Sequence, residues 1–228
     1  DGEVEQNFKT VTPELVDLKI TDRCSFGCTY CYMGSTKNGK DNPKISTWAI
    51  AEALGKMQVF EAAIGGGEPT QSANFIDLLC QLRRNGVIPN FTTYDLEWLK
   101  DEKRNQEILD LCGSFAYSVR DVVDANKLVE AHGSLDRKHK HKVNAQIVMG
   151  TIGRVEFESI LAVVDMANID VTLLGYKTTG FGANYDPIDY GWWPESVKKA
   201  GMWGIGIDTM LAQQTDMRGI NVDRKSVV

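Results

Sequence analysis

The chain has 228 residues, of which 43% are hydrophobic and 25% are charged, and this mix excludes collagen-like, low-complexity and wholly disordered proteins. Its 25 basic and 31 acidic side chains give a net charge of −6, which disfavours a broad nucleic-acid-binding surface. The sequence contains no run of about 18 apolar residues, so it predicts no membrane span. The acidic, polar stretch 1–7 differs from a secretory signal, so we expect a cytoplasmic location.

Short apolar runs alternate with longer amphipathic runs along most of the chain. The apolar runs predict six strands, at residues 15–20, 60–64, 88–93, 115–119, 143–149 and 171–174. The amphipathic runs predict five helices: one capped by Thr47 and running to Met57, then 75–84, 97–111, one capped by Asp124, and 157–167. This alternation predicts a parallel α/β sheet with right-handed crossovers. The pattern alone leaves open whether the sheet stays open or curls into a full or partial barrel.

After Gly175 the periodicity weakens. Residues 180–182, 192–194 and 201–206 are typical of loops and turns, with one possible strand at 202–207. We therefore predict a single domain with an irregular C-terminal portion, whose tail from residue 217 has no clear period.

Five cysteines are present, and three of them, Cys24, Cys28 and Cys31, fall within eight residues. An odd, clustered set disfavours a disulfide framework and favours metal binding. Three thiolates on one short loop can hold three corners of an iron–sulfur cube and leave one iron open to an outside molecule. Structural zinc is the weaker alternative, because it needs four ligands and no second cysteine pair exists. Cys80 and Cys112 stand alone in apolar helical contexts.

The segment Gly65-Gly66-Gly67-Glu68-Pro69 follows the second predicted strand. Consecutive glycines let backbone groups approach a ligand closely, although a plain strand-to-helix turn is an alternative interpretation. Loops that follow parallel strands open at the same edge of the sheet. We therefore expect the glycine segment and the cysteine segment to be neighbours.

The spacing Cys24-x3-Cys28-x2-Cys31, with Tyr30 before the last cysteine, together with Gly66-Gly67-Glu68-Pro69, resembles the radical S-adenosylmethionine (radical SAM) superfamily. The resemblance covers residues 14–177 and implies a partial (β/α)6 TIM-like barrel, between an N-terminal extension (1–13) and a C-terminal extension (178–228) that packs on or closes the barrel. It implies a 4Fe-4S cluster and S-adenosyl-L-methionine as cofactors.

The activity implied by the resemblance is reductive cleavage of S-adenosylmethionine to a 5′-deoxyadenosyl radical, which abstracts hydrogen from a substrate. An electron donor such as a flavodoxin or ferredoxin is the implied partner. The cofactors supply this chemistry, while the protein supplies positioning and shelter from water.

The resemblance also implies cofactor contacts. The glycine motif matches the family's contact to the methionyl amino group, and the aromatic residue before the last cysteine matches a backbone contact to adenine. Residues at the end of strand four are candidates for ribose or carboxylate contacts, and those at the end of strand six for adenine or substrate contacts. On strand five, Asn144 and Gln146 are also candidates, although a purely structural polar role is an equal alternative for them. The implied cofactor-binding residues are Tyr30, Gly66, Gly67, Glu68, Ser118, Arg120, Asn144 and Tyr176. No catalytic side chain is predicted, and Thr92-Thr93-Tyr94 is expected only to line the pocket.

The sequence of residues 21–32 is similar to the corresponding segment of SPASM-like members of the superfamily. Those members modify peptides or proteins and carry extra clusters in a C-terminal domain. This sequence departs from them, because no cysteine follows Cys112. Either the protein works with one cluster, or residues of its C-terminal part are absent from this sequence. We expect a single-cluster enzyme that abstracts hydrogen from an unassigned substrate, for which a peptide side chain and a small metabolite or nucleotide are the candidates. An iron–sulfur electron-transfer or scaffold protein and a zinc-stabilised binding module are the competitors from other classes.

Two further features are expected to be structural. The charged run 137–142 is expected to be a solvated loop on the face away from the cysteines. Trp192, Trp193 and Trp203 are expected to pack against the fold rather than bind substrate.

Overall fold

The computed structural model describes residues 12–41, 46–202 and 204–216. Most of the predicted N-terminal extension, Trp203 and the tail from residue 217 lie outside the described residues. Within the described ranges, no helix is long and apolar enough to cross a membrane.

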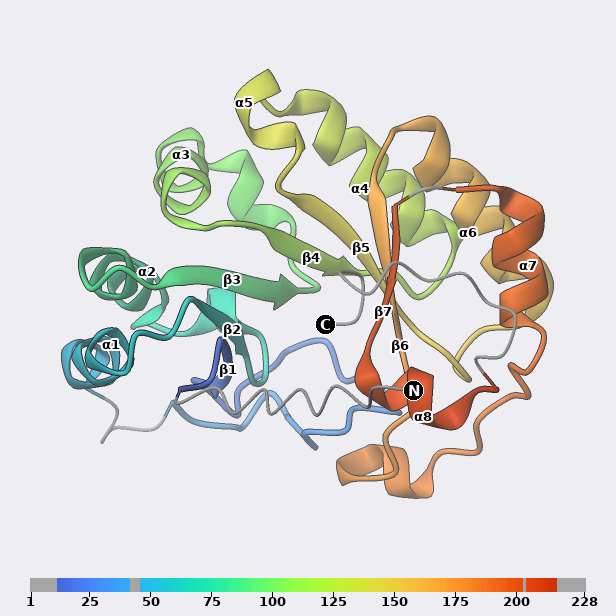
Figure 1. Cartoon of the computed structure of the whole chain (residues 1–228), viewed down its shortest axis with the longest axis horizontal. Helices are drawn as coiled ribbons and strands as arrows, with labels where there is room; N and C mark the ends of the chain where they lie inside the picture. Colours follow the sequence, from blue (N-terminus) through green and yellow to red (C-terminus); the bar gives the residue numbers. More distant parts are fainter. Residues whose placement is uncertain (1–11, 42–45, 203, 217–228) are drawn as a thin grey trace, which may run out of the picture.

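Seven strands in the described part of the chain form one parallel sheet, and each strand pairs with the next in sequence. Figure 1 shows that the sheet curls into a half-barrel with helices α1 to α7 along its outer side. The strands are β1 (Leu15–Lys19), β2 (Glu61–Gly65), β3 (Ile88–Thr93), β4 (Phe115–Ser118), β5 (Val143–Val148), β6 (Asp170–Leu174) and β7 (Ile205–Ile207).

The crossovers between strands carry the helices, as the predicted alternation requires. The α-helices are α1 (Thr47–Lys56), α2 (Phe75–Arg84), α3 (Glu102–Leu111), α4 (Val122–Ser134), α5 (Arg137–Lys140), α6 (Arg154–Met166), α7 (Trp193–Ala200) and α8 (Thr209–Gln214). The short 3₁₀ helices are η1 (Pro69–Gln71), η2 (Glu97–Lys100) and η3 (Gly180–Asn184).

Side chains alternate across the sheet, as strand geometry dictates. On β5, Val143, Ala145 and Ile147 are buried in the hydrophobic core, where the inner faces of the helices also lie. Asn144 and Gln146 point to the opposite face and are only partly covered. The core thus fills the space between sheet and helices, while the concave face of the half-barrel carries polar side chains.

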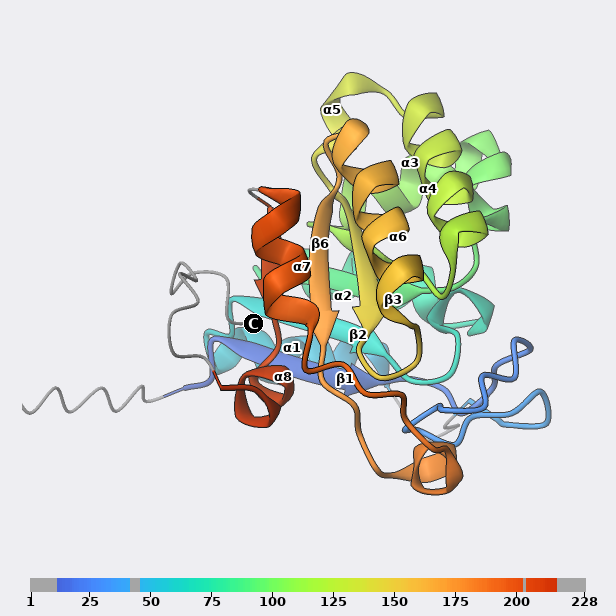
Figure 2. The ribbon, with the colours of Figure 1, turned by 90° about the vertical axis from the view of Figure 1, so that its right-hand side faces the viewer.

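The sheet register brings the carboxyl ends of the strands to one edge. Lys19 of β1 is level with Gly65 of β2, and Ser118 of β4 is level with Gln146 of β5. In Figures 1 and 2 the blue segment after β1 and the orange segment around η3 both lie at this edge. The edge is where folds of this type place their ligand sites.

Two predicted helix caps are wrong by one and three residues. Helix α1 is capped by Ser46, whose hydroxyl accepts from the Ala49 amide, rather than by Thr47. Helix α4 is capped by Asp121, whose carboxylate accepts from the Asp124 amide (2.8 Å). Asp124 therefore lies inside the first helical turn and is free to bind elsewhere.

Three predicted segments also differ from the structure. The helix expected at 97–111 is interrupted because Asp101 is extended and caps α3. Residues 192–194 begin helix α7 instead of forming a loop, since Pro194 lies in the first turn, where proline needs no hydrogen bond. The charged run 137–142 contains α5, and its His139 is buried with Nε2 3.0 Å from Asp110.

The sheet has one more strand than the six implied by the resemblance. Strand β7 lies within the possible strand predicted at 202–207 and pairs in parallel with β6. Asp208 follows β7, caps the unpredicted helix α8 through the Leu211 amide (2.7 Å), and accepts from the Gly175 amide (2.8 Å) with the same oxygen. One carboxylate thereby connects the end of β6 to α8.

We expect Asp208→Ala to lower the free energy of unfolding by about 2 kcal/mol, because two backbone amides lose their acceptor. Urea denaturation measures this change. Asp208→Asn, which keeps a side-chain oxygen in place, is the control and should lose less than half as much. Equal losses in the two variants would contradict the capping role.

Candidate functional site

The cysteine loop (residues 21–41) follows β1 and carries three free thiols. Cys24, Cys28 and Cys31 are each partly exposed, so none is sealed in the core. The Cys31 amide donates to the Cys28 carbonyl (3.2 Å), which closes a turn. Gly27 has a φ of 64°, in the left-handed region that favours glycine. The local sequence therefore folds the loop tightly around the thiols.

The electrostatics of the loop favour a bound cation. Burial raises the pKa of the Cys24 and Cys28 thiols above the ordinary value, and a neighbouring thiol raises each further. Arg120 opposes this effect at Cys28, where its guanidinium Nη1 lies 3.9 Å from Sγ. Metal ions ionise coordinating thiols, so positive iron would relieve the cost of forming thiolates here.

The donor set fits an iron–sulfur cube. Among residues 12–41, 46–202 and 204–216, no group of three or more Cys, His, Asp or Glu side chains converges on a single metal ion. A cube does not require such convergence, because each cysteine binds a different iron. Cys24 and Cys28 influence each other electrostatically, as do Cys28 and Cys31, so the thiols are neighbours. Three soft sulfur ligands on one loop suit a cluster with one iron free of protein ligands.

The glycine loop (residues 66–68) follows β2 and binds the backbone that leads into the cysteine loop. The Gly67 amide donates to the Thr21 carbonyl (2.7 Å), and the Glu68 amide donates to the Arg23 carbonyl (2.8 Å). A Cβ atom on Gly67 would lie 2.0 Å from the Arg23 oxygen, and one on Gly66 would lie 2.5 Å from the Thr21 oxygen. The predicted proximity of the two loops is confirmed, and glycine is required because backbone meets backbone.

Glu68 is buried with a relative exposure of 2%, and its carboxylate bonds to the protein itself. Oε1 accepts from the hydroxyls of Thr93 (2.7 Å) and Thr70 (2.8 Å), and Oε2 accepts from the Tyr94 amide (2.8 Å). Burial raises the pKa of Glu68 to about 7, although the bonds from Thr93 and Thr70 oppose this rise. The side chain thus fixes the glycine loop to the end of β3.

Two more of the implied residues lie beside the cysteines. Arg120 follows β4 and reaches Cys28, as described above. Tyr30 packs edge-on against Tyr185 (5.7 Å between ring centroids), and burial raises the pKa of its hydroxyl. Cys28 also contributes to that rise, which shows that Tyr30 is close to the thiols.

The remaining implied residues are more scattered. Ser118 ends β4 at the edge that carries the loops. Asn144 lies one inward-facing position deeper than Gln146, and its Oδ1 atom is buried without a hydrogen-bond partner. Tyr176 is buried, and its hydroxyl donates to the Gly182 carbonyl (2.6 Å), so it supports the η3 segment from within.

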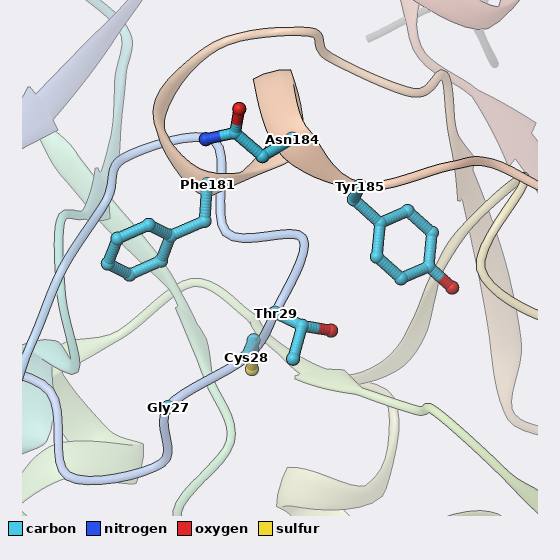
Figure 3. A pocket seen from close by; sticks show the side chains of 6 residues that line it. All are labelled: Gly27, Cys28, Thr29, Phe181, Asn184 and Tyr185. Carbon is cyan, nitrogen blue, oxygen red and sulfur yellow. The ribbon is translucent and has the colours of Figure 1, made fainter.

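A cavity of about 390 Å³ adjoins Cys28. One wall comes from the cysteine loop, and the other comes from the η3 segment (residues 177–185) more than 150 positions away, as Figure 3 shows. The Phe181 amide donates to the Cys31 carbonyl (2.9 Å), which joins the two walls. The lining residues are Gly27, Cys28, Thr29, Phe181, Asn184 and Tyr185.

Sequence reasoning missed the η3 wall and underrated Tyr94. The aromatic residues around Gly180 and Gly182 were a usable signal, because rings beside tight turns commonly line sites. Gly180 has a φ of 56°, and a Cβ there would lie 2.5 Å from the Tyr32 carbonyl oxygen. The η3 segment therefore touches the cysteine loop through backbone, which no helical or strand periodicity can report.

A parallel half-barrel with a three-cysteine loop after β1 and a glycine loop after β2 defines a class of β/α protein suited to hold an iron–sulfur cluster at its strand ends. Residues 18–103 match the Radical SAM superfamily. With the fold and both motifs, this match identifies a radical SAM domain in residues 18–103, and members of that superfamily use a 4Fe-4S cluster and S-adenosylmethionine.

Individual relatives are more distant. The chain is 26% identical over 186 residues to GTP 3′,8-cyclase of Haemophilus influenzae, covering 72% of this chain and 53% of that protein. It is 33% identical over 84 residues to the mycofactocin maturase MftC of Mycolicibacterium smegmatis, covering 36% of this chain and 21% of MftC. The chain thus spans about half the length of the cyclase.

Among solved structures, Streptococcus suis SuiB bound to its precursor peptide SuiA superposes with a TM-score of 0.67 at 13% identity, covering 93% of this chain and 53% of SuiB. SuiB bound to S-adenosylmethionine gives a TM-score of 0.63 at 16% identity, covering 83% and 47%. These matches confirm the α/β partial barrel.

We expect Gly67→Ala to lower the free energy of unfolding by about 2 kcal/mol or more, because the new Cβ must displace the Arg23 backbone. It should also reduce the iron retained after anaerobic reconstitution, measured per polypeptide. Gly65→Ala is a matched control two residues away, since nothing lies within 4 Å of a Cβ at that position. Similar losses in both variants would contradict the close-approach argument.

Glu68 should make stability depend on pH. Its pKa of about 7 in the folded protein exceeds the ordinary value of 4.5, so the folded state keeps a proton that the unfolded chain releases. The resulting stabilisation is present at low pH and is lost as the pH rises towards 7.

Between pH 6 and pH 8 the wild-type protein should therefore lose about 1 kcal/mol of stability that Glu68→Gln does not lose. Urea denaturation of both proteins at the two pH values measures the difference. A gap between them that stays constant with pH would mean that Glu68 is already ionised at pH 6.

Proposed function

We propose that the chain forms the catalytic core of a radical SAM enzyme that cleaves S-adenosylmethionine reductively. The observation that carries the proposal is the backbone-to-backbone contact of the glycine loop with the cysteine loop, in a half-barrel of this superfamily. When bound and reduced, the 4Fe-4S cluster would supply the electron that splits S-adenosylmethionine into methionine and a 5′-deoxyadenosyl radical for hydrogen abstraction.

In this proposal Cys24, Cys28 and Cys31 hold three irons of the cluster and leave the fourth for the amine and carboxylate of the cosubstrate. The glycine loop would offer backbone carbonyl groups to the amine of the cosubstrate, since its glycines let the loop pack directly against the backbone that leads into the cysteine loop. Glu68 contributes by fixing the loop, because both of its oxygens accept from protein donors.

The cavity between the cysteine loop and the η3 segment is a suitable place for part of the cosubstrate. Its aromatic wall, Phe181 and Tyr185, can pack on a flat heterocycle, and Asn184 can hydrogen-bond to ring nitrogens. Tyr30 adjoins this wall through Tyr185, which supports its proposed position near adenine. The wall also covers one side of the cluster loop from solvent.

We propose a peptide as the substrate. The concave positions of the central strands carry neutral hydrogen-bonding side chains, including Thr92, Ser118, Asn144, Gln146 and Thr172. Strands β3 to β6 contain no lysine or arginine, whereas a nucleoside triphosphate needs cations to bind its phosphates.

Amides and hydroxyls of this kind suit the neutral backbone of a peptide. The sequence of residues 21–32 is similar to that of peptide-modifying members, and this similarity also supports a peptide substrate. A nucleotide substrate is the second candidate, favoured by the 186-residue match to GTP 3′,8-cyclase. We further propose a flavodoxin or ferredoxin as the electron donor, and a cytoplasmic location.

The test is anaerobic. We expect the protein reconstituted with iron and sulfide, then given S-adenosylmethionine and dithionite, to produce 5′-deoxyadenosine detectable by mass spectrometry. Cys28→Ala should lose the product and the cluster, because one iron loses its ligand. Cys80→Ala, a thiol on α2 away from the loop, is the matched control and should keep both. A full cluster without any product in the wild-type protein would favour an electron-transfer role instead.

A further inference from the structure

Tyr94, the residue that directly follows β3, lies at the centre of an aromatic cluster beside the cysteine loop. Its ring stacks on Tyr117 (5.5 Å between centroids, 11° between planes) and meets the edge of Phe26 from the cysteine loop (4.9 Å). Its amide donates to Glu68 of the glycine loop. Tyr94 is therefore in contact with both loops that define the site.

The guanidinium of Arg120 lies flat against this cluster. Its Cζ atom is 3.5 Å from the centroid of the Tyr94 ring, a close cation–π contact. Its Nη1 atom faces the Sγ atom of Cys28 at 3.9 Å. A charged group is thus held between an aromatic ring and a cysteine of the site, with 32% of its side chain exposed.

Asp124 fixes this arrangement from behind. Its side chain is only 2% exposed, and both of its carboxylate oxygens accept from the Tyr94 hydroxyl (2.9 Å each). The same carboxylate accepts from the backbone amide and the Nε atom of Arg120 (3.3 Å each) and from Lys127 Nζ (3.1 Å). The ring, the backbone and the guanidinium are therefore joined to one buried anion.

These bonds leave Arg120 little rotational freedom. Nε is used by Asp124 and one face of the guanidinium is covered by Tyr94, so the Nη1 end remains directed at Cys28. A lysine at this position has a single point charge and cannot satisfy the ring, the carboxylate and the sulfur together. The contacts therefore hold the positive charge of Arg120 next to the Cys28 sulfur.

We propose that Asp124 and Tyr94 are positioning residues that hold Arg120 against the Cys28 sulfur, and that Arg120 raises the reduction potential of the bound cluster. Reduction adds one electron to the cluster, with no bond made or broken and no proton taken up. A fixed cation beside a thiolate ligand stabilises this added negative charge. The inference rests on the proposed function only in requiring that the three cysteines bind a cluster.

The test is a potentiometric titration of the reconstituted protein without S-adenosylmethionine, with dithionite as reductant and the reduced cluster followed by electron paramagnetic resonance. At the wild-type midpoint, Arg120→Gln should shift the ratio of oxidised to reduced cluster about tenfold towards the oxidised form, or about 59 mV for one electron. Tyr94→Leu should shift it in the same direction without any change of charge, because the guanidinium loses the ring that covers it and Asp124 loses the bond from the Tyr94 hydroxyl.

Lys127→Gln is the matched control. It removes a cation that also bonds to Asp124 but is not in contact with Cys28, so the midpoint should stay at the wild-type value. Arg120→Lys guards against misfolding of the glutamine variant, since it keeps the charge and should shift the ratio less than Arg120→Gln. Iron and sulfide content and circular dichroism are measured for every variant.

An Arg120→Gln protein with a full cluster and the wild-type midpoint would overturn the proposal. Contact with the cosubstrate would then be the only remaining role for Arg120. A shift in Arg120→Gln without one in Tyr94→Leu would overturn the positioning role of Tyr94 and of the Asp124 carboxylate that its hydroxyl binds. Because cosubstrate is absent, a failure of S-adenosylmethionine cleavage would overturn the proposed function without affecting the measured potentials.

Discussion

The contact between the glycine loop and the cysteine loop is the constraint on which the rest of the site depends. Two loops that follow neighbouring parallel strands approach so closely that the Gly67 amide bonds directly to the Thr21 carbonyl. Such an approach leaves no room for Cβ atoms on the second loop. The cysteine loop can then fold across the strand ends instead of extending into solvent, and its thiols come together. Glu68 extends the constraint to β3, since its buried carboxylate ties the second loop to Thr93 and Tyr94.

Much of this arrangement could be predicted from the sequence, because its causes are local. The spacing of Cys24, Cys28 and Cys31 and the glycine run are both visible in short windows, and strand and helix periods follow from which face is buried. Helix caps were less accurate: Ser46 precedes the predicted cap by one residue and Asp121 by three, because any of several polar residues near a helix start can accept from a first-turn amide.

The contacts across the site could not be predicted, because they join residues far apart in sequence. The Phe181 amide bonds to the Cys31 carbonyl across 150 positions, and Arg120 meets Cys28 across 92. Asp124 illustrates the physical reason. As a predicted cap it had a local partner, whereas in the structure Asp121 takes that role and leaves Asp124 to the Tyr94 hydroxyl and Arg120. A side chain's partner is decided by what the fold brings near it, and the sequence pattern does not record that.

Charge is distributed unevenly over the half-barrel: the strand ends beside the cysteine loop are charged, whereas the concave face is mostly neutral. Apart from Asp170 at the start of β6, strands β3 to β6 carry neutral hydrogen-bonding groups on their concave face, so the middle of the sheet can bind a neutral ligand without burying a charge. Fixed charge gathers instead at the strand ends, where Arg120 and Asp124 adjoin the cysteine loop. The Arg120 cation, already held in place, would stabilise an electron added at that edge. The concave face would exert little electrostatic force on a bound molecule. Under the proposed function, the charged strand ends would serve the cluster, and the more neutral concave face would contact the substrate.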